Sequence, residues 1–125
     1  MLSFLKPLFA GTPRLDPAEA VRLVTSGAAI LADVREADEL RAGGKAKEAL
    51  HLPLSTLART SDPKSGHFER KLQAALNGGK PLILYCASGA RSARAAGMLR
   101  AKGFAEVHNL GSLRDWVAGG GAVQR

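Results

Sequence analysis

The sequence predicts an α/β domain in three layers, with a mostly parallel sheet of about five strands and helices on both faces. Short apolar runs alternate along the chain with segments of helical spacing, which is typical of such folds. Residues 81–85 form an unbroken apolar run, as expected for a strand covered on both faces. A length of 125 residues fits one domain, and no internal repeat or linker is evident.

The first predicted helix begins at Asp16, which is suited to cap it. Pro17 fits the first helical position, and Glu19 completes a capping-box spacing. Gly27 ends this helix. The apolar residues 28–32 then predict a short buried strand.

The middle of the chain is less regular. Residues 36–42 predict a short helix closed by two glycines, and residues 50–54 an edge strand, because Pro53 suits a central strand poorly. The apolar spacing of residues 67–77 predicts a further helix that ends at Gly78.

The last third predicts two more strands and two more helices. The expected order is strand 81–85, a small-residue loop, helix 92–102, strand 106–110 and helix 112–118. Three successive glycines from Gly119 predict a flexible end. We therefore expect an apolar N-terminal arm (1–12), one domain (13–119) and a C-terminal tail (120–125).

Composition restricts the cellular compartment and the classes of partner that we expect. The apolar start is interrupted by Lys6 and Pro7, and the chain has no run of about 20 apolar residues, so we expect no signal peptide and no stable membrane insertion. A lone cysteine cannot form an internal disulfide, which favours a reducing, cytoplasmic location.

The net charge of +7 lies entirely in residues 63–125. Nucleic-acid binding would need a continuous basic stripe with stacking aromatics, but the basic residues are scattered and aromatic residues make up 5% of the chain. We expect no nucleic-acid partner. The charge is better suited to attracting small anions.

The lone cysteine, Cys86, directly follows the most apolar strand. Ligands of open α/β sheets bind beyond the carboxyl ends of the strands. The small residues that follow let backbone N–H groups converge on one point, and a helix start adds partial positive charge. Both effects favour a thiolate, which is the nucleophilic form. The alternative is a buried structural cysteine, which would not require the glycine-containing turn, the basic residue and the helix start that follow.

The segment Leu84-Tyr85-Cys86-Ala87-Ser88-Gly89-Ala90-Arg91-Ser92 resembles the active-site strand, loop and helix start of the rhodanese family of sulfurtransferases. Supporting similarity lies in Asp33-Val34-Arg35-Glu36, in Leu110-Gly111 and in Trp116. The resemblance covers nearly all of the chain. One stretch departs from the family, because Ala46-Lys47-Glu48 stands where an Ile-Pro-Gly turn is usual.

The resemblance implies a role for each matching residue. Cys86 is similar to the nucleophile that holds a sulfane sulfur as a persulfide. The amides of Ala87, Ser88, Gly89, Ala90 and Arg91 resemble the cradle for that anionic sulfur, and the Arg91 side chain resembles the group that holds an anionic donor such as thiosulfate. Asp33, Arg35 and Ser92 are expected to support the loop, with Asp33 and Arg35 either bracing it or pairing with Glu39. Cys86 itself is expected to be partly exposed in a shallow pocket.

No metal or organic cofactor is implied. His51, His67 and His108 lie on three different predicted elements without metal-ligand spacing. With no second thiol in the chain, the sulfur acceptor must be external, for example cyanide, glutathione, a thioredoxin-like protein or a sulfur-acceptor protein.

Other functions remain alternatives at this point. The chain can be a non-catalytic interaction module or a sulfur carrier served by a protein donor. A cysteine phosphatase is less favoured, because four residues separate Cys86 from Arg91 where phosphatases have five. An arsenate reductase with an internal thiol relay would need a second cysteine.

Overall fold

The structure is a computed structural model that describes residues 14–125. The expected N-terminal arm, residues 1–12, lies outside the described residues. The domain boundaries at residues 13 and 119 stay a prediction.

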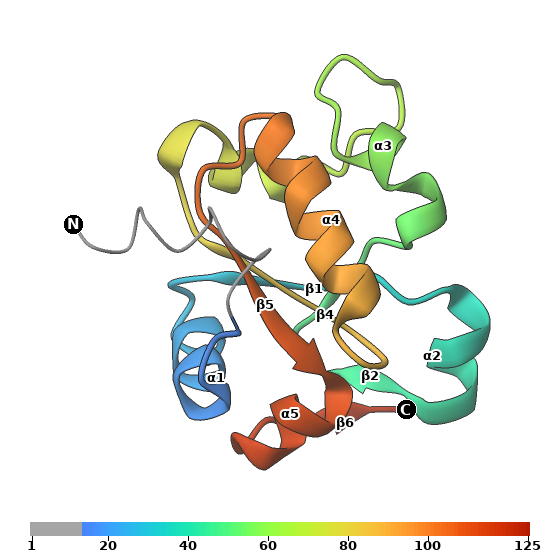
Figure 1. Cartoon of the computed structure of the whole chain (residues 1–125), viewed down its shortest axis with the longest axis vertical. Coiled ribbons are helices and arrows are strands. Elements are labelled where there is room, and N and C mark those ends of the chain that lie inside the picture. Colours follow the sequence, from blue (N-terminus) through green and yellow to red (C-terminus); the bar gives the residue numbers. More distant parts are fainter. Residues whose placement is uncertain (1–13) are drawn as a thin grey trace.

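A parallel sheet forms the centre of the molecule (Figure 1). Its strands lie in the order β3 (Leu50–His51), β1 (Ile30–Asp33), β4 (Leu82–Cys86) and β5 (Val107–Ser112), and neighbouring strands are all parallel. The predicted fold class is confirmed, with four strands in this sheet instead of about five. Beyond β5 the described chain makes only an isolated parallel bridge, between Arg14 and Asn109.

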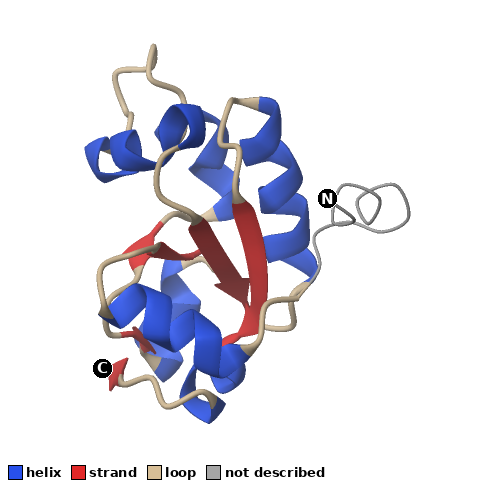
Figure 2. Ribbon diagram, turned by 90° about the vertical axis from the view of Figure 1, so that its left-hand side faces the viewer, coloured by secondary structure: helices blue, strands red, loops and turns tan. Residues whose placement is uncertain are grey.

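Helices cover both faces of the sheet (Figure 2). The helical elements of the described chain are α1 (Pro17–Thr25), α2 (Ala37–Gly43), the 3₁₀ turn η2 (Leu54–Thr56), α3 (Leu57–Thr60), the 3₁₀ helix η3 (Arg70–Gly78), α4 (Ala90–Ala101) and α5 (Leu113–Ala118). None of them is long and apolar enough to cross a membrane.

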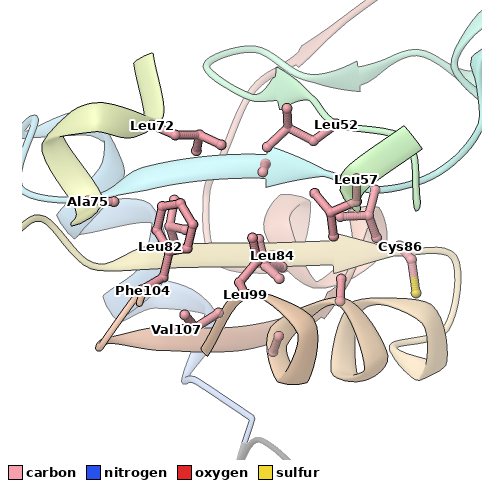
Figure 3. Packing of buried hydrophobic residues seen from close by; sticks show 14 residues of the cluster. Leu52, Leu57, Leu72, Ala75, Leu82, Leu84, Cys86, Leu99, Phe104 and Val107 are labelled. Atoms are coloured by element: carbon pink, nitrogen blue, oxygen red, sulfur yellow. The ribbon is translucent and has the colours of Figure 1, made fainter. Parts of the chain in front are cut away.

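Strand β4 separates two apolar cores, because successive side chains of a strand point to opposite faces. Leu82 and Leu84 pack with α3, η3 and α4 on one face (Figure 3). Ile83 and Tyr85 pack with α1 and with Trp116 of α5 on the other. All five residues of β4 are buried, as its unbroken apolar run predicted. This double covering fixes where β4 ends, and Cys86 is its last residue.

Residues 67–77 differ from the sequence prediction in the type of helix that they form. The helix expected over residues 67–77 is the 3₁₀ helix η3, and it is interrupted at Leu76 and Asn77. Asn77 has a φ of 57°, a left-handed conformation that asparagine tolerates better than most residues. This bend ends the helical run before β4.

The end of the chain is paired with the domain, although the glycines predicted a flexible tail. Strand β6 (Val123–Gln124) pairs antiparallel with β2 (Lys45–Ala46). The Trp116 indole donates a 2.8 Å hydrogen bond to the carbonyl of Ala122, which holds the segment in place. Ala46, the first residue of the stretch that departs from the family pattern, takes part in this pairing.

The parallel arrangement brings the carboxyl ends of β1, β4 and β5 to one edge of the sheet. Asp33 lies beside Tyr85, and Cys86 lies beside Ser112. The first helical turns of α4 and α5 begin at the same edge. Side chains that are distant in sequence therefore converge around Cys86.

Candidate active site

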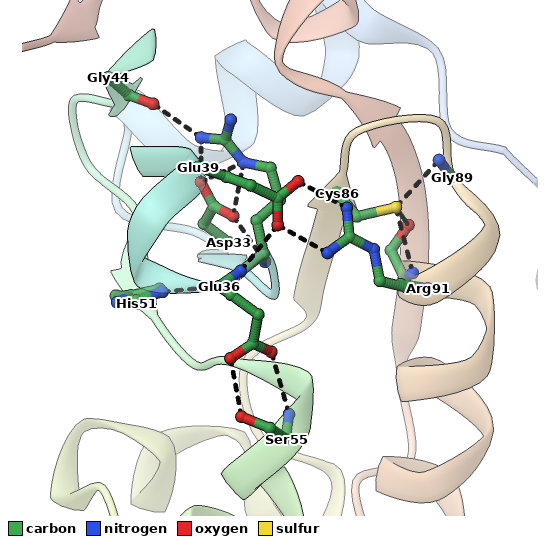
Figure 4. Close-up of polar contacts among 11 residues, drawn as sticks. Asp33, Glu36, Glu39, Gly44, His51, Ser55, Cys86, Gly89 and Arg91 are labelled. Carbon is green, nitrogen blue, oxygen red and sulfur yellow. Dashed lines mark hydrogen bonds and ion pairs between the residues drawn. The ribbon is translucent and has the colours of Figure 1, made fainter. Parts of the chain in front are cut away.

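The Cys86 sulfur is surrounded by hydrogen-bond donors from the loop and helix that follow it (Figure 4). The Gly89 amide donates to Sγ at 3.0 Å, and the Ser92 amide donates at 3.4 Å. The Ser92 hydroxyl also lies 3.4 Å from Sγ. Gly89 has a φ of 101°, a left-handed conformation that glycine adopts without strain and that turns the chain into α4. Of the expected amides of residues 87–91, that of Gly89 lies within hydrogen-bond distance of Sγ, and the other two donors belong to Ser92.

The prediction that Cys86 is partly exposed is wrong, because the residue is 1% exposed. The reason is the same convergence that was expected to activate it. The loop and the first turn of α4 fold over the sulfur, and Cys86 also packs with the core on the α4 side of the sheet.

The pKa of the Cys86 thiol is the result of opposing effects. Burial raises the pKa, while the Ser92 hydroxyl and the amides of Ser92 and Gly89 lower it by donating to the thiolate, with a smaller contribution from the nearby Ser88 amide. The net effect is a pKa below the ordinary value of 9.0. The surroundings therefore favour the nucleophilic form.

A buried asparagine forms hydrogen bonds with both residues that donate to the Cys86 sulfur. Asn109 is 2% exposed; its Nδ2 donates to the Gly89 carbonyl at 3.0 Å, and its Oδ1 accepts from the Ser92 hydroxyl at 2.7 Å. A carbonyl can only accept, so this contact fixes which end of the Asn109 amide faces Ser92. The single hydroxyl proton of Ser92 is thus shared between Asn109 and the Cys86 sulfur.

Asp33 and Arg35 form a buried ion pair. Arg35 Nη2 lies 2.7 Å from Asp33 Oδ2, and the two side chains are 8% and 0% exposed. The same guanidinium donates to the Gly44 carbonyl at 2.7 Å and lies 5.7 Å from the centre of the Tyr85 ring. Of the two expected arrangements for Arg35, pairing with Glu39 is wrong. Its partner is Asp33, the last residue of β1, which lies two positions before Arg35.

Glu39 pairs instead with Arg91, so that the starts of α2 and α4 are joined. The two guanidinium nitrogens of Arg91 donate to the two carboxylate oxygens of Glu39 at 2.7 and 2.8 Å. Glu39 Oε1 also accepts from the Glu36 amide at 2.9 Å. A cation at a helix start is unfavourable unless an anion lies close to it. In this structure the anion beside Arg91 is the Glu39 carboxylate.

A cavity of about 610 Å³ opens beside the loop. Its walls come from the ends of β1, β4 and β5 and from the first turn of α5. The lining residues are Arg35, Cys86, Ala87, Ser88, Ser112, Leu113, Arg114 and Asp115. Of the residues expected at the site, Arg35, Cys86, Ala87 and Ser88 line this cavity, while Gly89 and Ser92 contact the sulfur without lining it.

Sequence reasoning missed two contributors to the site, Arg114 and Asn109. Arg114 supplies a cation to the cavity, and its place just after β5 is the signal that could have found it. Asn109 acts through hydrogen bonds across the fold, which no local pattern reveals. Trp116 is a fully buried packing residue, and no cluster of three metal-ligating side chains occurs in residues 14–125.

The Glu39–Arg91 pair predicts a loss of stability in acid. The Arg91 guanidinium lowers the pKa of Glu39 from 4.5 to about 2. Because the folded-state pKa is the lower one, the pair's stabilisation is complete above pH 4.5 and is lost as the pH falls toward 2. In urea denaturation, the stability gap between the native chain and a Glu39→Gln variant should therefore close across this range. A gap that is independent of pH would contradict the assignment.

Comparison with known proteins agrees with the predicted resemblance. The family model described as "Rhodanese-like domain" matches residues 16–119. A human protein named thiosulfate:glutathione sulfurtransferase is 31% identical over 115 residues, which cover 86% of this chain and 96% of the human protein.

Solved structures are also similar to this chain. A human single-domain sulfurtransferase has a TM-score of 0.64 and 29% identity, over 86% of this chain and 97% of the human one. A protein from Rhodopseudomonas palustris, described as of unknown function and a possible tyrosine phosphatase, has a TM-score of 0.76 and 29% identity, over 90% of this chain and 85% of that one. Because the family model spans most of the sequence, and a human sulfurtransferase is 31% identical over almost its whole length, the chain belongs to the rhodanese-like domain family.

Proposed function

We propose that this chain is a sulfurtransferase in which Cys86 carries the sulfur. The observation that supports this most directly is the convergence of two amides and one hydroxyl on the Cys86 sulfur. Such donors stabilise negative charge without moving, which is what a thiolate nucleophile and an anionic persulfide both need. The first turn of α4 adds the N–H groups of Ala90 and Arg91, which an α-helix leaves without internal partners.

The proposed reaction has two steps. The Cys86 thiolate attacks the sulfane sulfur of thiosulfate, a new S–S bond forms on Cys86, and the S–S bond of thiosulfate breaks as sulfite leaves with the electron pair. An external nucleophile then attacks the outer sulfur of the persulfide, and the Cys86 thiolate leaves. Cyanide would leave as thiocyanate, and a thiol acceptor would leave as a persulfide.

The cavity suits an anionic donor and a larger acceptor. Arg35 and Arg114 line it, but the Arg35 guanidinium is already paired with Asp33, so we propose that Arg114 meets the negative charge of the donor. A volume of about 610 Å³ exceeds what a small anion needs, which leaves room for glutathione or for a cysteine presented by a thioredoxin-like or other sulfur-acceptor protein. A role for Arg91 in holding the donor stays a prediction, since Glu39 occupies its guanidinium here.

We also propose a cytoplasmic setting, because a lone activated thiol is best preserved in a reducing compartment.

Mass spectrometry of the intact native chain after incubation with thiosulfate tests the function. We expect a gain of one sulfur atom that is removed by cyanide, together with the release of thiocyanate. In a parallel sample, an aryl phosphate should give neither a phosphorylated protein nor product. Absence of the sulfur adduct with turnover of the aryl phosphate would instead favour a cysteine phosphatase.

A further inference from the structure

Arg14 lies behind the Cys86 loop, although nothing in its sequence surroundings connects it with the site. Its Nη2 donates to the Ser88 carbonyl at 2.9 Å, and its Nη1 lies 3.8 Å from Asp115 Oδ2. The backbone is held there as well, because Arg14 forms a parallel bridge with Asn109 and the next amide, Leu15, donates to the Asn109 carbonyl at 2.9 Å. Arg14 is thus fixed to β5 while its side chain reaches the loop.

The carbonyl that Arg14 holds belongs to the same peptide unit as a donor to the sulfur. A peptide unit is planar and trans, so its C=O and N–H point in opposite directions. The Ser88 carbonyl points at Arg14, and the Gly89 N–H of that unit points at Cys86 Sγ. Fixing one end of this unit therefore fixes the direction of the other.

Two glycines make room for the guanidinium. Gly89 and Gly111 have φ values of 101° and 112°, and a Cβ on either would collide with guanidinium atoms of Arg14. One glycine belongs to the Cys86 loop and the other to β5, so the guanidinium, whose side chain is 55% exposed, lies against both elements.

We propose that Arg14 is a positioning residue whose guanidinium holds the Ser88–Gly89 peptide with its N–H directed at the Cys86 sulfur. The importance of this contact for catalysis rests on the proposed role of Cys86 as nucleophile. Loss of the guanidinium frees the peptide to rotate, which weakens one of the bonds that favour the thiolate.

Several other charged side chains surround the sulfur. The test therefore has to distinguish a general electrostatic effect on the thiol from the effect of the hydrogen bond between Arg14 and the Ser88 carbonyl. Besides Arg14, they are Arg35 just after β1 with its partner Asp33, Arg91 of α4 with its partner Glu39 of α2, and Arg114 and Asp115 of α5. A purely Coulombic effect of Arg14 would be screened by salt, whereas an effect on the direction of a short hydrogen bond would persist.

The experiment is the pH dependence of Cys86 alkylation by iodoacetamide, which requires no sulfur transfer and has one possible target, since the chain has a single cysteine. In Arg14→Met we expect the midpoint to rise by about half a pH unit, which means about threefold less thiolate below the midpoint. The rise should persist in about 1 M salt, where the screening length is about 3 Å. Arg22→Met, which removes an exposed arginine paired with Glu19 on α1, is the matched control and should leave the midpoint unchanged.

A second readout follows the peptide itself. In the NMR spectrum of Arg14→Met, the Gly89 amide proton should lose the downfield shift of a hydrogen bond to sulfur, with a smaller change at Ser92. Thermal unfolding establishes that the variant is folded, and Arg14→Gln repeats both measurements should the methionine variant not fold. An unchanged midpoint in a folded variant, or a rise that high salt abolishes, overturns the proposal. Failure of the native chain to form a persulfide would overturn the proposed function and leave this result standing.

Discussion

Replacement of Cys86 by serine is expected to abolish sulfur transfer, with the rate of thiocyanate formation from thiosulfate and cyanide falling about a thousandfold or more. A serine hydroxyl is not ionised at neutral pH, and oxygen in its place cannot carry the outer sulfur of a persulfide. The same variant should show no gain of a sulfur atom by mass spectrometry. Steady-state kinetics and intact-mass measurement check both expectations.

The fold should survive this change, so that the loss can be assigned to chemistry. Serine is close in size to cysteine, and its oxygen can accept the hydrogen bonds that the Gly89 and Ser92 amides now donate to sulfur. Ser65→Ala, in the loop between α3 and η3, is a matched small substitution remote from the cavity and should retain activity. Substantial thiocyanate formation by Cys86→Ser would show that another group carries the sulfur.

Asp33→Ala is expected to give the largest loss of stability, about 3–5 kcal/mol in the free energy of unfolding. Asp33 is fully buried and is the carboxylate partner of Arg35, whose side chain is only 8% exposed. Removing the carboxylate leaves a buried guanidinium with the Gly44 carbonyl and the Tyr85 ring as its neighbours. Urea denaturation measures the loss.

An exposed pair on the neighbouring helix provides the control. Asp38 and Arg41 of α2 also form an ion pair, but their side chains are 88% and 71% exposed. Water already solvates both groups, so Asp38→Ala should change the stability little. If Asp33→Ala were no more destabilising than Asp38→Ala, the buried pair would not be a main support of this edge of the sheet.

The start of α1 and the buried strand β4 could be predicted from the sequence, because both depend on residues that are neighbours in the chain. Asp16 caps α1 by accepting from the Glu19 amide at 3.1 Å, as its place before Pro17 predicted, while the Glu19 side chain pairs with Arg22 and does not complete a capping box. The unbroken apolar run before Cys86 predicted a strand covered on both faces, and β4 is buried throughout. The glycines at the chain end misled the prediction, because pairing of β6 with β2 and the Trp116–Ala122 bond depend on distant partners.

By itself, the sequence determined that a cysteine stands where a buried strand ends, and that a small-residue turn and a helix start come after it. These features could be predicted because apolar runs, glycines and helix ends are local properties of the chain. Tertiary structure alone decided how enclosed the thiol is, that Arg35 pairs with Asp33 and Arg91 with Glu39, and that Asn109 and Arg14 hold the loop from behind. For each of these side chains, the sequence was compatible with several different partners. The choice among them depends on distances between elements, which are set only when both faces of the sheet are packed.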